Sequence, residues 1–358
     1  MLPATATASI PSIDYNRASW MSIRPPGRPQ DAVPLPPPLV LGSAACTPPL
    51  AAAAVTVGNF DGVHLGHAAI VRRLVAIAAE RGVPAVALTF DPHPASIVRP
   101  AAAPVPLTTP RRRAELLLAL GLDAVLVQPA DAALLSLSAE AFYREMLRGR
   151  LGGVAFVEGT DFRFGAGRVG DVALLQQLAT ADGASLEVVP PVALDGQPVS
   201  SSRLRSLIAA GDVAAAAGLA TAPYRLTGRV VSGARRGATL GFPTANLAEV
   251  ATLLPAAGVY AARARTGGEP GDAAGFFPAA VNVGPAPTFG VEASGVEVHL
   301  IGFTGDLYGT TLHVDFLERL RDTRRFDSAA DLQAQLADDV ARAAAVAGEP
   351  AAAPARET

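Results

Sequence analysis

The segment AVTVGNFDGVHLGHAAIVRRLVAIAAE, residues 54–80, decides the fold of the first half of this chain. It begins inside a short apolar run, 51–57, which is typical of a strand buried on both faces of a parallel sheet. Glycine, asparagine and aspartate favour tight turns, so the residues after this run predict a turn at the edge of the sheet. That turn contains Gly58, Asn59, Phe60, Asp61 and Gly62.

A helix is expected after this turn, over 68–81, because apolar residues recur there at helical spacing. His64 and His67 are three residues apart, so their side chains share one side of the first turn. The free backbone N–H groups and the positive end of the helix dipole lie at the same place, which is an arrangement that binds phosphate. The two imidazoles can hold the phosphoryl oxygens of a nucleotide, and Gly66 lets a phosphate approach the backbone closely.

The histidine pair has two plainer interpretations, a metal site or an ordinary helix surface. A zinc site would need further cysteine or histidine ligands. The chain has one cysteine, Cys46, and five histidines, which argues against metal ligation. The strand, the Gly-Asn-Phe-Asp-Gly turn and the following helix instead favour the phosphate interpretation.

The composition excludes several classes of function. The chain has 358 residues and a net charge of −3, which gives no electrostatic reason to expect nucleic acid or a membrane as partner. All 29 basic residues are arginine, so a P-loop lysine, a Schiff-base lysine and a protein-kinase lysine are excluded. One cysteine rules out an internal disulfide, and neither a signal peptide nor a transmembrane helix is expected. A cytoplasmic location is the resulting prediction.

Two domains are expected between two tails. Residues 1–35 are rich in proline and alanine and predict a disordered extension, and 347–358 predict a flexible tail. Alternating strands and helices within 36–215 predict an α/β doubly wound sheet. Expected strands are 51–57, 85–90, 124–127, 154–157 and 186–189, and the further expected helices are 110–120, 139–148 and 172–178.

Three more motifs follow strands or open a helix in this half, where functional residues of such sheets collect. They are TFDPHP (89–94), GTDFRFG (159–165) and SSSRLR (200–205). Taken singly, they are an ordinary turn, a surface loop and a helix cap. The candidate site residues are Asp91, His93 and Pro94 in the first, Asp161, Arg163 and Arg168 in and beyond the second, and Ser201, Ser202, Arg203 and Arg205 in the third.

Residues 220–346 change to short strands separated by glycine and proline turns, which predicts a β-barrel with a terminal helix at 329–346. The expected strands are 224–232, 258–265, 278–283, 296–303 and 311–320. The string GRVVSGARRGATLGFPTANL, 228–247, offers glycine amides for a phosphate and two oxygen ligands for Mg²⁺. Phosphate candidates are Gly233, Arg235, Arg236, Gly237, Gly241, Phe242 and Pro243, and the metal candidates are Thr244 and Asn246.

These motifs resemble one known family. A strand followed by HxGH resembles the nucleotidylyltransferase superfamily. The longer string GNFDGVHLGH and the three later motifs together resemble a more specific family, over about 51–210. This is the adenylyltransferase module of bacterial bifunctional riboflavin kinase/FAD synthetases. The second half of the chain resembles the riboflavin kinase module, over about 220–346. The residues that carry this resemblance are the string ending in GFPTANL and Glu297 and His299 in VEVHL. Glu297 and His299 alternate along a strand and so share one face.

The resemblance implies a fold and two reactions. An N-terminal Rossmann-like nucleotidylyltransferase domain would precede a riboflavin kinase barrel, and the barrel would convert riboflavin and ATP to FMN. The first domain would then join FMN and ATP into FAD and pyrophosphate. By resemblance the catalytic residues are His64, His67 and Glu297, the 89–94 motif lies on the flavin side, and Mg²⁺ assists. The resemblance also implies that the arginines and serines of the later motifs bind ATP and its phosphates, together with Gly58, Asn59, Phe60, Asp61, Gly66 and Asp161. Transient self-association is a further partner prediction.

The chain departs from the family pattern at three places, Ala238, Gly302 and the junction LATAPY (219–224). Arg235 and Arg236 can compensate for the charge missing at the first. Two other interpretations remain open. One is a nucleotidylyltransferase with another acceptor, such as nicotinamide mononucleotide or phosphopantetheine, fused to an unrelated barrel. The other is a flavin-binding regulator or storage protein without catalysis.

Overall fold

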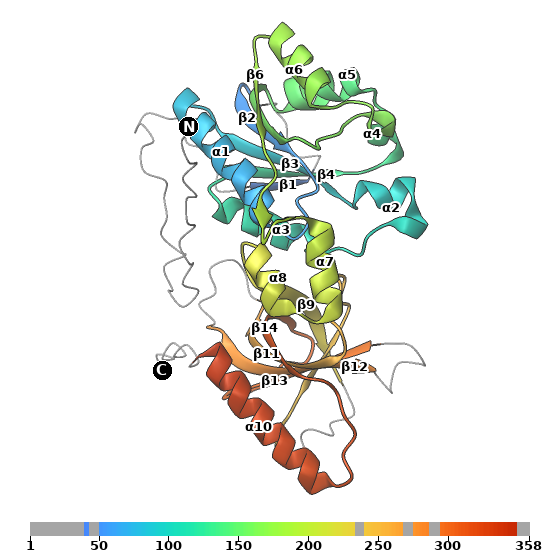
Figure 1. Ribbon diagram of the computed structural model, residues 1–358, viewed down its shortest axis with the longest axis vertical. Helices are drawn as coiled ribbons and strands as arrows, with labels where there is room; N and C mark the ends of the chain where they lie inside the picture. Colours follow the sequence, from blue (N-terminus) through green and yellow to red (C-terminus); the bar gives the residue numbers. More distant parts are fainter. Residues whose placement is uncertain (1–38, 43–49, 233–239, 268–274, 286–293, 349–358) are drawn as a thin grey trace, which may run out of the picture.

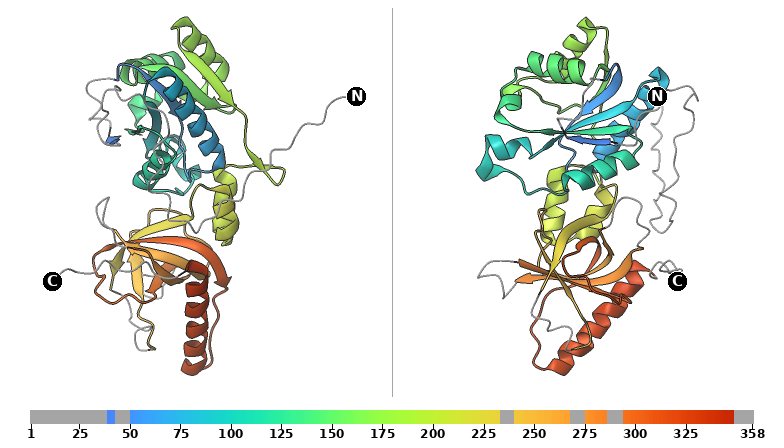
Figure 2. Two further views of the ribbon diagram at one scale, coloured as in Figure 1. Left: turned by 90° about the vertical axis from the view of Figure 1, so that its left-hand side faces the viewer. Right: turned by 180° about the vertical axis from the view of Figure 1, so that it is seen from behind.

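A computed structural model describes residues 39–42, 50–232, 240–267, 275–285 and 294–348 of the chain. A sheet flanked by helices forms the upper part in Figure 1 and a barrel with one long helix forms the lower part. Two short helices lie between them, which the side view in Figure 2 also shows. The predicted extension 1–35 and the last ten residues of the predicted tail lie outside the described residues.

The upper sheet has the strand order β1-β4-β3-β2-β5-β6, and every neighbouring pair is parallel. The predicted doubly wound α/β fold is therefore confirmed. All five residues of the central strand β2 are buried, because helices cover both faces of the sheet. The strands are β1 (Leu39–Gly42), β2 (Ala53–Val57), β3 (Ala85–Asp91), β4 (Ala124–Pro129), β5 (Gly153–Gly159) and β6 (Ser185–Val189).

The four predicted helices of this domain differ from the structure mainly at their ends, and the short helices α2 and α4 were not predicted. Helix α1 begins at Leu65, three residues before the predicted start, because the side chain of His64 caps it. The predicted helix 139–148 continues from α5 as a π-helix, Tyr143–Arg150, and ends where the Leu151 N–H donates to the Met146 carbonyl. The helices are α1 (Leu65–Arg81), α2 (Pro94–Val98), α3 (Pro110–Ala119), α4 (Ala132–Leu135), α5 (Ala139–Phe142) and α6 (Val172–Ala181).

The lower part is a closed antiparallel barrel with the strand order β10-β13-β12-β11-β14-β9. Strand β10 lies in the PTAN segment and was not predicted, because its four residues are too short for a strand pattern. It closes the barrel by pairing with β9 and β13. The strands are β9 (Tyr224–Val231), β10 (Ala245–Ala248), β11 (Gly258–Thr266), β12 (Phe277–Pro285), β13 (Ser294–Leu300) and β14 (Thr311–Arg321).

Helices α7 (Ser201–Ala210) and α8 (Val213–Leu219) join the two parts. Their buried residues belong to the same apolar core as the interior of the barrel, and Leu107 from the loop before α3 packs into that core as well. A small hairpin of β7 (Ala193–Leu194) and β8 (Gln197–Pro198) precedes α7. The adenylyltransferase-like half therefore shares a hydrophobic core with the barrel.

The terminal helix α10 (Ala329–Ala347) packs against β11, β12 and β14, as the lower part of Figure 1 shows. The apolar residues Leu332, Leu336 and Val340, which share one face of this helix, are only half-buried, and its fully buried residues are Asp339 and Ala343. The carboxylate of Asp339 accepts from Arg321 at 2.6 and 2.9 Å and from Gln335 at 3.0 Å. A buried ion pair thus fixes this helix to β14. In the described parts of the chain, no helix is both long and apolar enough to cross a membrane.

We expect Asp339→Ala to lower the free energy of unfolding by about 3 kcal/mol, because the substitution leaves the Arg321 charge without its buried partner. Chemical denaturation of the full chain measures the loss. Asp338→Ala, one residue away and exposed, is the control and should change stability by less than about 0.5 kcal/mol. Equal losses in the two variants would show that the ion pair does not hold the helix.

Candidate active sites

The HxGH turn forms a compact aromatic cluster at the start of α1. Nδ1 of His64 accepts from the His67 backbone N–H at 3.3 Å, which makes His64 the N-cap of the helix. The two imidazole rings stack with centroids 3.6 Å apart, and Phe60 meets His67 edge-on at 5.2 Å. A Cβ at Gly66 would lie 3.1 Å from the His64 ring, so glycine at this position allows the stack. The structure thus brings His64, His67, Phe60 and Gly66 together.

Both histidines of this cluster are neutral near pH 7. Burial lowers the pKa of His64 to about 4, although the charges of Asp161 and Asp61 oppose the change. Burial also lowers the pKa of His67 well below its ordinary value, and the neighbouring His64 and Arg113 lower it further. Because Nδ1 of His64 accepts a hydrogen bond, its proton resides on Nε2, and that N–H is a donor. Nδ1 of His67 is buried without a partner among the described residues.

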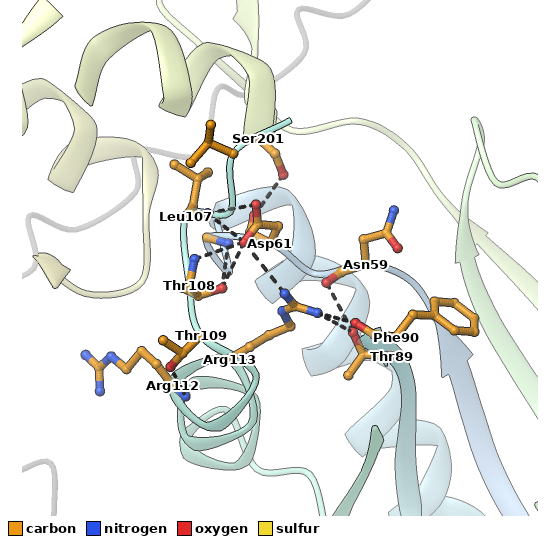
Figure 3. A network of polar contacts seen from close by, with 12 residues as sticks. Asn59, Asp61, Thr89, Phe90, Leu107, Thr108, Thr109, Arg112, Arg113 and Ser201 are labelled. Atoms are coloured by element: carbon orange, nitrogen blue, oxygen red, sulfur yellow. Dashed lines mark hydrogen bonds and ion pairs between the residues drawn. The ribbon is translucent and has the colours of Figure 1, made fainter. Parts of the chain in front are cut away.

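Asp61 is the centre of a buried network beside these histidines (Figure 3). Its carboxylate accepts from the backbone N–H groups of Leu107 and Thr108 and from the Thr108 hydroxyl, each at 3.0 Å. Arg205 reaches the same carboxylate at 2.6 Å, and the hydroxyl of Ser201 donates to the Asp61 carbonyl at 2.8 Å. The turn 58–62, the segment 107–108 and helix α7 are therefore tied to one carboxylate.

Arg113 extends this network to the ends of two strands. Its guanidinium lies 3.9 Å from Asp61 and donates to the Thr89 hydroxyl at 3.1 Å and to the Phe90 carbonyl at 2.9 Å. The Thr89 hydroxyl in turn donates to the Asn59 carbonyl at 3.1 Å, as Figure 3 shows. The sequence prediction did not include Arg113. Its position in a run of three arginines at the start of a helix resembled an exposed, solvated face.

The loops after β3 and β5 converge on the same region. His93 caps α2 by accepting from the Ala95 N–H at 3.1 Å. Burial lowers the pKa of His93, Asp61 opposes the change, and Arg205, Arg113 and Arg168 lower it further. The GTDFRFG motif is closed by a bridge between Phe164 and Gly170. Exposed side chains at this edge of the sheet are those of Asp91, Asp161, Arg163, Arg168 and Ser202.

Two predicted phosphate-binding arginines already have partners in the protein. Arg203 donates to the carbonyls of Leu194 and Gln197 in the β7–β8 hairpin at 3.0 and 3.2 Å. Arg205 binds Asp61 and also the Val105 carbonyl, at 3.0 Å. Both side chains stabilise the segments around the site, and this leaves Arg163 and Arg168 as the exposed cations of the three motifs.

Glu158 is a buried acid that the sequence prediction missed. It is the penultimate residue of β5, and its carboxyl accepts from the Val57 N–H at 2.8 Å, where β2 leaves the sheet. Burial raises the pKa of Glu158 well above its ordinary value of 4.5; the Val57 bond opposes this rise and the Asp161 charge adds to it. The side chain therefore keeps its proton to a higher pH than an exposed glutamate does. A titratable residue directly after the apolar run 153–157 was the available signal.

The second candidate site lies on the barrel, where Glu297 occupies the middle of a polar row. Register pairs Glu297 on β13 with Asn246 on β10 and with Asn282 on β12. Directly paired residues of antiparallel strands point to the same face, with Cβ atoms about 5 Å apart. The three side chains are half-buried, whereas their strand neighbours fill the barrel core. Asn282 was not predicted, because only the strand pairing brings it beside Glu297.

The loop that leads into β10 is fixed by two neighbours. The ring of His299 makes a hydrogen bond of 2.8 Å with the Pro243 carbonyl and meets Phe242 edge-on at 5.7 Å. Gln333 on α10 donates to the Leu240 carbonyl at 3.4 Å. Thr244 is half-buried and Gly241 is exposed beside these contacts. Gly233, Arg235, Arg236 and Gly237 of the predicted phosphate loop, and the departure at Ala238, lie outside the described residues.

The donors on the barrel fit a hard divalent cation. Within the described ranges no group of three or more histidine, cysteine, aspartate or glutamate side chains could hold a metal. Thr244, Asn246, Asn282 and Glu297 instead offer neutral and anionic oxygens in one region. Mg²⁺ prefers oxygen ligands and completes its shell with water and substrate phosphates, so a small set of this kind is sufficient.

Comparison with known proteins agrees with this architecture. A family model described as FAD synthetase matches residues 47–203, and one described as riboflavin kinase matches 220–347. The bifunctional riboflavin kinase/FMN adenylyltransferase of Pseudomonas fluorescens is 39% identical over 82% of this chain and 92% of its own length. The enzyme of the same name from Escherichia coli strain K12 is 35% identical over 80% of this chain and 90% of its own.

A solved structure has the same overall fold. It is described as a macrolide-efflux protein from Streptococcus pneumoniae, is 29% identical, and covers 84% of this chain and 97% of its own at a TM-score of 0.73. We carry no transport activity over from that description, because both family models and the enzymes above point to flavin chemistry.

Fold and sites define a two-domain transferase that handles nucleotides. The chain belongs to the bifunctional riboflavin kinase/FMN adenylyltransferase family. The predicted family, the predicted order of an FAD synthetase domain before a riboflavin kinase domain, and the two predicted activities are confirmed. Riboflavin, FMN and ATP as small-molecule substrates follow from these activities.

We expect Glu158→Gln to stabilise the chain increasingly as pH rises. Between the pKa of Glu158 in the unfolded chain and its higher pKa in the folded protein, only the folded state holds the proton. The free energy of unfolding of the wild type therefore falls as pH rises through this range, by at most about 1.4 kcal/mol per pH unit. Glutamine keeps the acceptor for the Val57 N–H and has no proton to lose. Denaturation of both proteins at several pH values measures the difference, which should be smallest below pH 4.5. A difference that stays constant with pH would contradict the buried neutral acid.

Proposed function

We propose that Glu297 is the general base of riboflavin phosphorylation in the barrel. The observation that carries this proposal is the polar row in which Glu297 lies between Asn246 and Asn282 on paired strands. Glu297 accepts the proton of the riboflavin 5′-hydroxyl, the hydroxyl oxygen bonds to the γ-phosphorus of ATP, and the bond to the β-phosphate oxygen breaks. The products are FMN and ADP, and the proton remains on Glu297 until water removes it.

Thr244 and Asn246 would hold Mg²⁺ in this site, with phosphate oxygens completing its coordination. The bound ion would neutralise the charge that develops on the triphosphate. The contact of His299 with the Pro243 carbonyl supports the loop that carries Thr244, so His299 orients the site without touching the reacting atoms. Gly241, Phe242 and Pro243 belong to the same proposed phosphate loop as the residues outside the described ranges.

The proposed second reaction joins FMN to the adenylyl group of ATP in the sheet domain. A phosphate oxygen of FMN bonds to the α-phosphorus, and pyrophosphate leaves. The FMN phosphate is already ionised, so no strong base is needed, and the task of the site is to position the reactants and to stabilise charge. His64 and His67 meet this task as neutral donors: two uncharged rings stack without charge repulsion, and their N–H groups would donate to phosphoryl oxygens.

The remaining predicted residues divide into two proposed groups. Exposed and half-buried residues at the carboxyl edge of the sheet would contact substrates. These are Arg163, Arg168, Ser202 and Asp161 on the ATP side, and the exposed Asp91 with the half-buried His93 and Pro94 on the flavin side. The inward residues would support them. Asp61, Arg203, Arg205 and Ser201 already bind protein groups, so we propose that they shape the phosphate site and do not hold the phosphates directly.

We also propose the finer features that accompany this function. The boundaries 36–215 and 220–346 are our proposed domain limits. A cytoplasmic location rests on the single cysteine and on the intracellular nature of ATP and flavin cofactor synthesis. Independence from nucleic acid and membranes rests on the net charge of −3, and transient self-association is testable by sedimentation at two concentrations.

A chromatographic product assay tests the two reactions together. The purified chain, incubated with riboflavin, ATP and Mg²⁺, should form FMN first and FAD afterwards. FMN without FAD, even when FMN is supplied directly, would mean that the sheet domain uses another acceptor. Bound flavin with neither product would identify a flavin-binding regulator and overturn the proposed mechanism.

We expect His67→Ala to lower FAD formation from supplied FMN by at least about a hundredfold and to leave riboflavin phosphorylation unchanged, because phosphoryl oxygens lose a donor at one site only.

Glu297→Ala and the shape-matched Glu297→Gln should lower riboflavin phosphorylation by about 10² to 10⁴-fold and leave FAD formation from supplied FMN unchanged. Each variant serves as the folding control for the other domain. A folded variant that loses both activities would refute the division of labour.

A further inference from the structure

The short segment between α8 and β9, called the linker below, contacts the HxGH turn directly. After α8 the chain passes through Ala220 and Thr221 before it enters β9. Ala220 forms an isolated antiparallel bridge with His64, outside the regular strands. Thr221 donates twice to the Val63 carbonyl, from its backbone N–H at 3.2 Å and from its hydroxyl at 2.8 Å. A segment far along the sequence thus binds the residue immediately before the catalytic histidine.

Val63 has an unusual backbone conformation, and this makes the contact significant. Its φ is 38°, in the left-handed region that β-branched residues rarely adopt, and its side chain is completely buried. Phe60, at the other end of the turn, also has a positive φ of 46°, and its carbonyl accepts from the Val63 N–H at 3.1 Å. A strained turn of this kind persists only where its surroundings hold it, and functional sites are where such strain collects.

The left-handed conformation also decides where His64 points. It turns the Val63 carbonyl toward the linker, and His64 then adopts the extended conformation of an N-cap with φ −82° and ψ 174°. Nδ1 of His64 binds the His67 N–H, so Nε2 faces away from the helix end and, among the described residues, is a donor without a partner. Any relaxation at Val63 would rotate this donor relative to the stacked His67 ring.

We propose that Thr221 is a positioning residue for adenylyl transfer, because its hydroxyl holds the Val63 carbonyl and thereby fixes the turn that orients His64. The proposal rests on the FMN adenylyltransferase activity of the sheet domain. Thr221 does not contact the reacting atoms. Loss of its hydroxyl leaves the bond from its backbone N–H, so the chain keeps its fold while the turn gains freedom.

The test measures FAD formation from supplied FMN in three variants of the full chain. Thr221→Val removes the hydroxyl, and Thr221→Ser keeps it. Thr310→Val is the matched control: Thr310 also donates its hydroxyl to a carbonyl, that of Leu307 at 2.7 Å, but it lies on the barrel before β14. Riboflavin phosphorylation and thermal unfolding are measured for each protein, so that loss of folding is separated from loss of positioning.

Thr221→Val should lower kcat for FAD formation about tenfold and leave KM for FMN within about twofold, because the donor geometry matters most in the transition state. Thr221→Ser should stay within about threefold of wild type, and Thr310→Val should match wild type in this reaction. The proposal is overturned if Thr221→Val retains wild-type kcat, if Thr221→Ser loses as much as Thr221→Val, or if Thr310→Val loses as much. Inactive wild-type protein would refute the adenylyltransferase function itself, which is a separate outcome.

Discussion

The buried carboxylate of Asp61 is the interaction on which the geometry of the sheet domain depends. A buried charge is costly unless it is paired and hydrogen-bonded, and this carboxylate is satisfied by two backbone N–H groups, a hydroxyl and Arg205. These partners of the Asp61 carboxylate lie far from the HxGH turn in the sequence, at 107–108 and in helix α7. The electrostatic requirement of one side chain therefore fixes the turn 58–62, the loop before α3 and helix α7 relative to one another (Figure 3).

The same region is where the two domains meet. The Leu253 N–H of the barrel donates to the Pro106 carbonyl next to the segment that binds Asp61, and Leu107 enters the barrel core. On the outer face of the barrel, Asp315 binds Arg225 and Arg263, and the Phe276 ring lies against both arginines. Arg112 of α3 and Arg225 line one pocket, and burial, followed by the Arg225 charge, lowers the pKa of Arg112 to about 10. An apolar core and a charged border together hold the domains.

The two candidate sites are built by different means. In the sheet domain, loops from the carboxyl ends of parallel strands converge, and neutral histidines and exposed arginines lie at that edge. In the barrel, strand register alone aligns Asn246, Glu297 and Asn282 on one face. The first site needs supporting residues to hold its loops, whereas the hydrogen-bonded ladder holds the second. Among the residues that the structure describes, a buried polar network accordingly lies beside His64, whereas Glu297 is held between paired strands.

The sequence by itself determined the class of fold, the family and most elements to within a few residues, because periodicity and short motifs are local properties. It did not predict β1 or β10, whose four residues become strands only through their neighbours. It placed Asp61 and Arg205 beside phosphate, whereas the tertiary structure turned them toward each other. The tertiary structure alone showed the roles of four further residues, because these roles depend on burial, register and contacts between distant segments, which no local pattern encodes. The four residues are Glu158, Asn282, Arg113 and Thr221.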